Sequence, residues 1–273
     1  MTTVNQPSAP PLFEARGLYK SFGPVQVLRD VDFAIHAGEV TALVGDNGAG
    51  KSTLVKCIAG SHGYDVGELR FEGRPVSIHN PRDAAVLGIE IVYQDLALCD
   101  NLDIVQNMFL GRERRNGIVL DDPTMEELAS RTLASLAVRT VQSVRQRVAA
   151  LSGGQRQTVA IAKSVLWESR VVILDEPTAA LGVAQTAQVL ELVRRLADNG
   201  HAVVLISHNM NDVFAVSDRI AALYLGRMAA QVKASDVTHS QVVELITAGR
   251  SGELGLPPER ETPAGFQDNG EVL

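Results

Sequence analysis

Apolar residues fall along this chain in two patterns, which predict strands in some regions and helices in others. Short runs rich in Val, Ile and Leu, bounded by Gly, Pro, Asn or Ser, predict β-strands. They occupy residues 12–18, 25–35, 39–44, 69–71, 76–78, 89–93, 171–174, 202–206 and 220–225. Helical spacing predicts helices at 51–59, 184–197 and 209–216, and Asn80 before Pro81 marks the start of another.

Residues 101–168 differ from the rest because helical spacing runs through them without a convincing strand. The helices expected there are 103–110, 123–137 and 154–166. After this region strands and helices alternate, which predicts a parallel sheet with helices on its faces. The expected fold class is therefore α/β, with residues 101–168 inserted as a helical subdomain.

The two ends of the chain lack these patterns. Residues 1–11 are polar and Pro-rich, without the basic start and apolar core of a signal peptide, and residues 249–273 are rich in Gly, Pro and Glu. We expect both ends to be mobile and residues 12–248 to form the folded domain.

Composition limits the classes of function. A chain of 273 residues, 45% of them hydrophobic, can form one large α/β domain, and its net charge of -7 disfavours nucleic acid as a partner. No apolar run approaches the roughly 18 residues of a spanning helix, so a membrane role would be peripheral. Cys57 and Cys99 have no metal-ligand spacing and are expected to be reduced thiols of a cytosolic protein.

A glycine-rich segment between a predicted strand and a predicted helix has the spacing of a phosphate-binding loop. Its backbone N–H groups and the positive end of the helix would bind phosphate oxygens. Lys51 would reach the β- and γ-phosphates of a nucleotide, and the hydroxyl of Ser52 would bind Mg²⁺. The full segment is Gly45, Asp46, Asn47, Gly48, Ala49, Gly50, Lys51, Ser52 and Thr53.

Two carboxylates follow the apolar run at 171–174. Ligands of open α/β sheets bind at the carboxyl ends of the strands, where a buried carboxylate needs a partner or a metal. Asp175 is therefore expected to act at Mg²⁺, and Glu176 to orient and polarise the water that attacks the γ-phosphate.

Three further side chains are candidates for the same site. His208 follows another strand and would hold the γ-phosphate and orient Glu176, although a lone histidine there can be structural. Gln94 would contact Mg²⁺ or the attacking water. The alternative is that Gln94 is only a polar residue at the end of a strand, without a role in the site. Phe22 is our choice for the aromatic ring stacked on adenine, with Tyr19 as its rival, and a simple place in the core is the alternative for either ring.

Residues 152–155 predict a second site for anions. Ser152 would cap the helix that starts at Gly153 and Gly154, followed by Gln155, and the exposed N–H groups would bind phosphate. One chain would then have two phosphate-binding surfaces. Two copies in a head-to-tail arrangement would bind each nucleotide between them, so association would depend on ATP.

Taken in order, these motifs resemble the full set of the ATP-binding cassette family over residues 12–247. That resemblance implies a P-loop NTPase core, a small antiparallel β part and a helical subdomain that carries residues 151–155. It also implies a nucleotide-sandwich dimer that drives a membrane permease.

A finer likeness is to the ATPases of bacterial ribose-, xylose- and fructose-type importers. It lies in residues 92–98, 107–113, 176–182 and 207–210, along the region that would face the permease. It implies uptake of a pentose or hexose at the cytoplasmic face of the membrane, with an external sugar-binding protein as an indirect partner. An ATPase for another solute, a soluble cassette protein of translation or DNA repair, and a nucleotide-gated regulator remain alternatives.

Two positions depart from the family pattern. Gly182 stands where the loop after Glu176 commonly has Asp, which puts a contact across the dimer in doubt. Lys163 stands where arginine is usual.

Overall fold

Six strands form the central sheet of the computed structural model, which describes residues 10–136, 138 and 141–257. Their order is β12-β11-β3-β10-β9-β6, and all neighbours are parallel except β11 and β12. The strands are β3 (Val40–Val44), β6 (Ile89–Val92), β9 (Val171–Asp175), β10 (Ala202–Ile206), β11 (Arg219–Tyr224) and β12 (Arg227–Lys233). The predicted parallel sheet is confirmed, and β12 is a strand that the sequence analysis missed.

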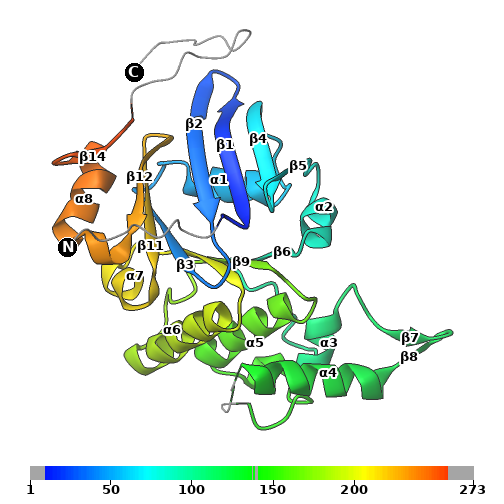
Figure 1. Cartoon of the computed structure of the whole chain (residues 1–273). Helices are drawn as coiled ribbons and strands as arrows, with labels where there is room; N and C mark the ends of the chain where they lie inside the picture. Colours follow the sequence, from blue (N-terminus) through cyan, green and yellow to red (C-terminus); the bar gives the residue numbers. More distant parts are fainter. Residues whose placement is uncertain (1–9, 137, 139–140, 258–273) are drawn as a thin grey trace, which may run out of the picture.

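A separate antiparallel sheet lies above the central one in Figure 1. Its order is β2-β1-β4-β5, with β1 (Phe13–Phe22), β2 (Val25–Ile35), β4 (Val66–Phe71) and β5 (Arg74–Val76). The helix α1 (Lys51–Ile58) packs against this sheet, and α2 (Pro81–Val86) begins after Asn80, whose side chain caps it as predicted. The α/β fold class with a small antiparallel part is therefore confirmed.

The central sheet has apolar cores on both faces because successive side chains of a strand point to opposite faces. Ile173 and Val204 belong to the core shared with the antiparallel sheet and α1. Leu174 and Leu205, their neighbours in sequence, belong to the core under the helices. A strand buried on both faces is apolar at every position, which is why these runs were recognisable in the sequence.

Helices form the lower layer of Figure 1. The three expected within 101–168 are confirmed with small shifts at their ends, as α3 (Ile104–Phe109), α4 (Asp122–Ser135) and α5 (Gly153–Val165). A short 3-10 turn, η1 (Val148–Ala150), precedes α5. The expectation of no strand there is wrong, since β7 (Arg115–Asn116) and β8 (Val119–Leu120) form a hairpin. Two-residue strands are too short to show a period, and Gly117 (φ 66°) makes the turn.

The C-terminal part contains more structure than the sequence analysis expected. The helices α6 (Val183–Asp198) and α7 (Met210–Val216) were predicted, whereas η2 (Ala234–Asp236) and α8 (His239–Ala248) were missed. Residues 250–255 were expected to be part of a mobile tail but form the hairpin of β13 (Arg250–Ser251) and β14 (Leu254–Gly255), with Ser251 buried. Residues 1–9 and 258–273, where mobile ends were predicted, lie outside the described residues.

None of the helices in the described part of the chain is long and apolar enough to cross a bilayer.

Candidate functional site

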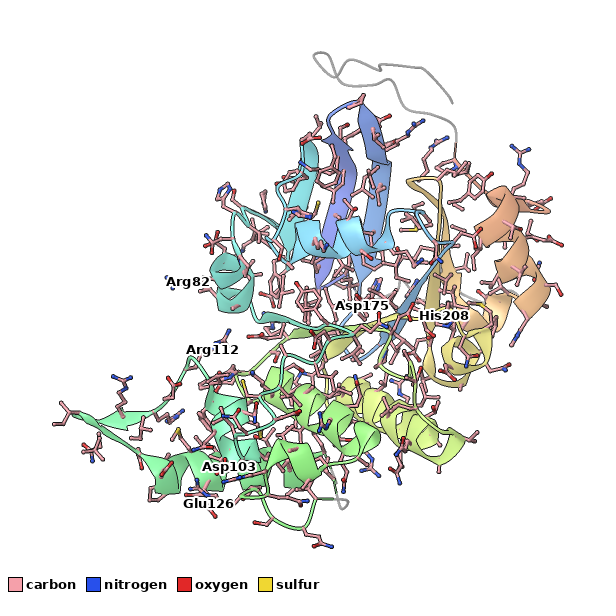
Figure 2. The ribbon with its side chains drawn as sticks, turned by 180° about the vertical axis from the view of Figure 1, so that it is seen from behind. Arg82, Asp103, Arg112, Glu126, Asp175 and His208 are labelled. Atoms are coloured by element: carbon pink, nitrogen blue, oxygen red, sulfur yellow. The ribbon has the colours of Figure 1, made fainter. Side chains whose placement is uncertain are left out.

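The carboxyl ends of four parallel strands meet at one edge of the central sheet. Strand register aligns Ile206 of β10 with Asp175 of β9 and with Leu43 of β3, and Val92 of β6 with Leu174. The segments after these strands carry the glycine loop, Glu176, His208 and Gln94. Asp175 and His208, labelled in Figure 2, lie near each other at this edge.

The loop between β3 and α1 has a backbone that glycine alone fits at two positions. At Gly45 (φ 155°) a Cβ atom would lie 2.4 Å from the carbonyl oxygen of Leu223, and at Gly50 (φ 104°) one would lie 3.0 Å from that of Val27. The loop therefore lies directly against β11 and β2. This close approach holds the residues from Asp46 to Ala49 as a tight turn immediately before α1.

Lys51, the first residue of α1, folds back over this loop. Its Nζ donates to the carbonyl oxygens of Gly45 (2.6 Å) and Asp46 (3.0 Å). Burial lowers the pKa of the ammonium, while the nearby carboxylates of Glu176, Asp46 and Asp175 act in the opposite direction. The cation is thus held at the mouth of the loop, where it can reach an anion. The side chains of Ser52 and, after β6, Gln94 are exposed, and Thr53 is half-buried.

Asp175 and Glu176 occupy different environments although they are adjacent. Asp175 ends β9, and burial, reinforced by the charge of Glu176 and opposed by Lys51, raises its pKa. Glu176 has a left-handed backbone (φ 48°), and its N–H donates to Ile206 (3.0 Å). This turn directs the Glu176 carboxylate to Nδ1 of His208, 3.0 Å away. The His208 side chain is 73% exposed, so the rest of its ring is open to a ligand.

A second contact between the same two segments was missed in the sequence. Thr178 Oγ1 donates to Oδ2 of Asp212 over 2.7 Å, and Asp212 is buried in the first turn of α7. Thr178 follows Glu176 by two residues and Asp212 follows His208 by four. The signal that could have revealed this pair is that Thr178 and Asp212 are polar residues only a few positions after the predicted site residues.

Residues 152–155 form the predicted helix start, in the helical layer. Ser152 Oγ accepts from the N–H of Gln155 (3.3 Å), and Gln155 Oε1 accepts from the N–H of Ser152 (2.9 Å). A Cβ on Gly153 would lie 3.3 Å from Leu181 Cδ2, and one on Gly154 would lie 3.1 Å from the Gln185 side chain. The start of α5 therefore packs against the segment that follows Glu176. Gly182, at the N-cap of α6, makes no side-chain cap.

The two aromatic candidates differ in exposure. Tyr19 is buried at 6% exposure and cannot offer a ring face, whereas Phe22 is 45% exposed. Phe22 pairs with Val25 at the end of β1 and β2 where the two strands form their hairpin. Val27, two residues after Val25 on β2, lies against Gly50 of the glycine loop. Phe22 therefore lies on the strand pair that borders the glycine loop.

A groove opens beside Gln94, between β6, α3 and α5. Its cavity has a volume of about 240 Å³. Arg112 lines it, with an ion pair to Glu90 (2.8 Å) and its guanidinium 5.5 Å from the Trp167 ring centre. Burial lowers the pKa of Lys163. The main side chains of the lining are Tyr93, Asp95, Leu110, Arg112, Lys163 and Trp167.

Comparison with known proteins gives matches over most of the chain. The family model described as ABC transporter matches residues 28–179. The fructose import ATP-binding protein of Rhizobium meliloti is 47% identical over 88% of this chain and 95% of its own length. The xylose/arabinose import ATP-binding protein of Sulfolobus acidocaldarius is 44% identical over 91% of this chain and 99% of its own length. A ribose import ATP-binding protein of Rubrobacter xylanophilus is 41% identical over 96% of this chain but only 51% of its own length.

Solved structures share the fold. A nucleotide-free ATP-binding cassette from an ABC transporter has a TM-score of 0.75 at 21% identity, covering 86% of this chain and 94% of its own. The ADP conformation of another such cassette has a TM-score of 0.76 at 22% identity, covering 88% and 96%.

Proposed function

This chain belongs to the ABC transporter family and is an ATPase, and from that premise we propose that it powers the import of a pentose or hexose through a membrane permease. The contact of Glu176 with His208, at the sheet edge that also carries Lys51, is the observation that supports hydrolysis. The sugar assignment is supported by relatives named for import of fructose, xylose or arabinose, and ribose.

Hydrolysis by these residues divides into binding and proton transfer. The glycine loop and Lys51 bind the phosphates, and Phe22 stacks on adenine. Glu176 accepts the proton of the attacking water as the new oxygen–phosphorus bond forms and the bond between the γ-phosphate and its bridging oxygen breaks. His208 holds Glu176 in place through Nδ1 and offers its exposed ring edge to the γ-phosphate.

The residues fit a bound Mg²⁺. This ion prefers one or two carboxylates together with substrate phosphates, and Asp175 is a half-buried carboxylate next to a second one, Glu176, at the same sheet edge. Ser52 and Gln94 would supply further oxygen ligands from the protein. When bound, Mg²⁺ neutralises the charge that develops on the phosphates.

A second copy of the chain completes the nucleotide site. Ser152 to Gln155 lie at the start of a 13-residue helix, where the helix dipole favours an anion, and Ser152 and Gly153 are exposed there. In a two-fold dimer each nucleotide lies between the glycine loop of one copy and residues 152–155 of the other. The groove at Tyr93, Leu110 and Arg112 faces the permease on the cytoplasmic side of the membrane, and the external sugar-binding protein acts only through that permease.

The test is a co-purification from membranes. Tagged Glu176→Gln, loaded with ATP, is captured from detergent-solubilised native membranes and its partners are identified by mass spectrometry. A polytopic permease supports the proposal, and its cognate binding protein is then screened against pentoses and hexoses. Binding of another solute would replace the sugar assignment, and capture of ribosomes or repair factors alone would overturn the transport role.

Loss of the contact between Thr178 and Asp212 is expected to slow turnover without weakening nucleotide binding. The contact lies beside the one between Glu176 and His208, and misplacement of a reacting group by a small distance costs about tenfold to a hundredfold in rate. Thr178→Val removes the hydroxyl and is compared with Thr178→Ser, which keeps it. Steady-state kinetics should show kcat lowered in Thr178→Val alone, with KM unchanged. Equal kcat in the two variants would contradict this positioning role.

A further inference from the structure

Arg156, in the first turn of α5, folds back over the residues that precede the helix. Its Nε donates to the carbonyl oxygen of Leu151 (3.3 Å), and its Nη2 donates to that of Ala149 (3.4 Å). Its Nη1 donates to Oδ1 of Asp100 over 2.8 Å. One guanidinium therefore joins acceptors from two segments, the loop after β6 and the residues immediately before Ser152.

The loop that carries Asp100 is anchored from its other side by a buried amide. Asn107 of α3 is fully buried, its Oδ1 accepts from the N–H of Cys99 (2.7 Å), and its Nδ2 donates to the carbonyl oxygen of Cys99 (3.0 Å). The N–H of Ala149 donates to the carbonyl oxygen of Asp100 (3.0 Å). Because a buried amide is costly unless it is hydrogen-bonded, these contacts hold the loop in one conformation. Arg156 thus ties the start of α5 to a fixed part of the helical layer.

We propose that Arg156 is a positioning residue for the contact between the second copy and the nucleotide. Ser152 and Gly153 are exposed at the end of the segment that Arg156 holds, and in the proposed dimer they reach the nucleotide bound by the other copy. Hydrogen bonds weaken steeply when their angle changes, so a displaced segment would lose much of this contact. The inference rests on the proposed two-copy site, because there this surface meets a nucleotide.

The role assigned to Arg156 is one of geometry, since an ion pair at the surface contributes little to stability. The side chain of Asp100 is 63% exposed, but that of Arg156 is 32% exposed and also satisfies two backbone oxygens. Three different nitrogens of the guanidinium make these contacts. Lysine has its donors on one atom, so it would keep the charge without spanning the same acceptors.

Dimerisation with ATP in the Glu176→Gln background tests this role. Analytical ultracentrifugation at saturating ATP measures the dimer dissociation constant, and a fluorescent ATP analogue measures the affinity of the monomer. Arg156→Gln and Arg156→Lys should each raise the dimer dissociation constant about tenfold, with the monomer affinity unchanged and the Tm within a few degrees. Arg131→Gln, which breaks an exposed ion pair with Glu127 on α4, is the matched control and should dimerise like the background.

A double-mutant cycle shows whether Arg156 acts through Asp100. Asp100→Asn alone should weaken the dimer about threefold, and the double variant should be no weaker than Arg156→Gln alone. Additive effects would overturn the action through Asp100, and an unchanged dimer in Arg156→Gln would overturn the positioning role. A monomer affinity that falls together with the Tm would also overturn it, because that result indicates general damage to the fold.

The same measurements separate this inference from the proposed function. Normal dimerisation of the background and of both Arg156 variants would overturn the inference and leave the two-copy site in place. A background that stays monomeric with ATP would overturn the two-copy site and this role with it. Capture of a permease from membranes reports on transport independently of both.

Discussion

Glu176→Gln is expected to bind ATP like the wild type and to hydrolyse it about a hundred to ten thousand times more slowly. The amide has the size of the carboxylate but cannot accept the proton of the attacking water. It retains an oxygen that can face Nδ1 of His208, 3.0 Å away in the wild type, so the geometry of the loop is kept. Removal of a charge beside Lys51 and Asp175 leaves a site that is no less favourable to the phosphates.

The measurement compares phosphate release with equilibrium binding of a fluorescent ATP analogue. Glu191→Gln, which changes an exposed carboxylate paired with Arg195 on α6, is the control and should leave both quantities unchanged. Size-exclusion chromatography with ATP should show Glu176→Gln as a dimer, because the nucleotide is no longer consumed. Near-normal phosphate release would refute the role of Glu176 as proton acceptor.

Lys51→Met is expected to weaken ATP binding about a hundredfold or more, since charge-assisted hydrogen bonds to phosphate are lost from a partly desolvated site. The Lys51 ammonium contacts two carbonyl oxygens of the loop, and methionine cannot donate to either of them. Lys51→Arg is expected to restore little of the affinity for ATP, because a larger, planar guanidinium group does not fit where the compact ammonium lies.

Isothermal titration with ATP measures this loss directly. Lys233→Met is the control, because Lys233 is exposed at the end of the edge strand β12. Thermal unfolding without nucleotide should give the same Tm for Lys51→Met and the wild type within a few degrees. An unchanged affinity for ATP would remove Lys51 from the phosphate site.

The central sheet was predictable because its strands are apolar at successive positions. In β3 and β10 every residue is buried. An apolar run of this kind, followed by a glycine loop or by two polar residues, indicates a central strand of a parallel sheet. The order of the polar residues after these runs was therefore enough to predict that they converge. Strand register now aligns the ends of β9 and β10, and Glu176 contacts His208 as the sequence suggested.

Elements stabilised by distant contacts were not predictable in the same way. The edge strand β12 contains Gln231 and Lys233, and its Gln231 amide pairs with the backbone of Ala34 far away in the sequence. The helix α8 begins with a capping box of Thr238 and Gln241, a local signal that the sequence analysis overlooked. The choice between Tyr19 and Phe22 depended on burial, which a strand of mixed polarity does not reveal.

The packing of Gly153 against Leu181, and of Gly154 against Gln185, has a consequence for cooperativity. Within one copy, the start of α5 and the segment after Glu176 are in contact, so displacement of one displaces the other. In the proposed dimer the start of α5 would contact the nucleotide bound by the glycine loop of the second copy. The segment after Glu176 would move with the catalytic carboxylate at the nucleotide bound by its own copy. Binding of a nucleotide at one site would therefore affect the other site through these two contacts, and the two sites are expected to turn over as a coupled pair.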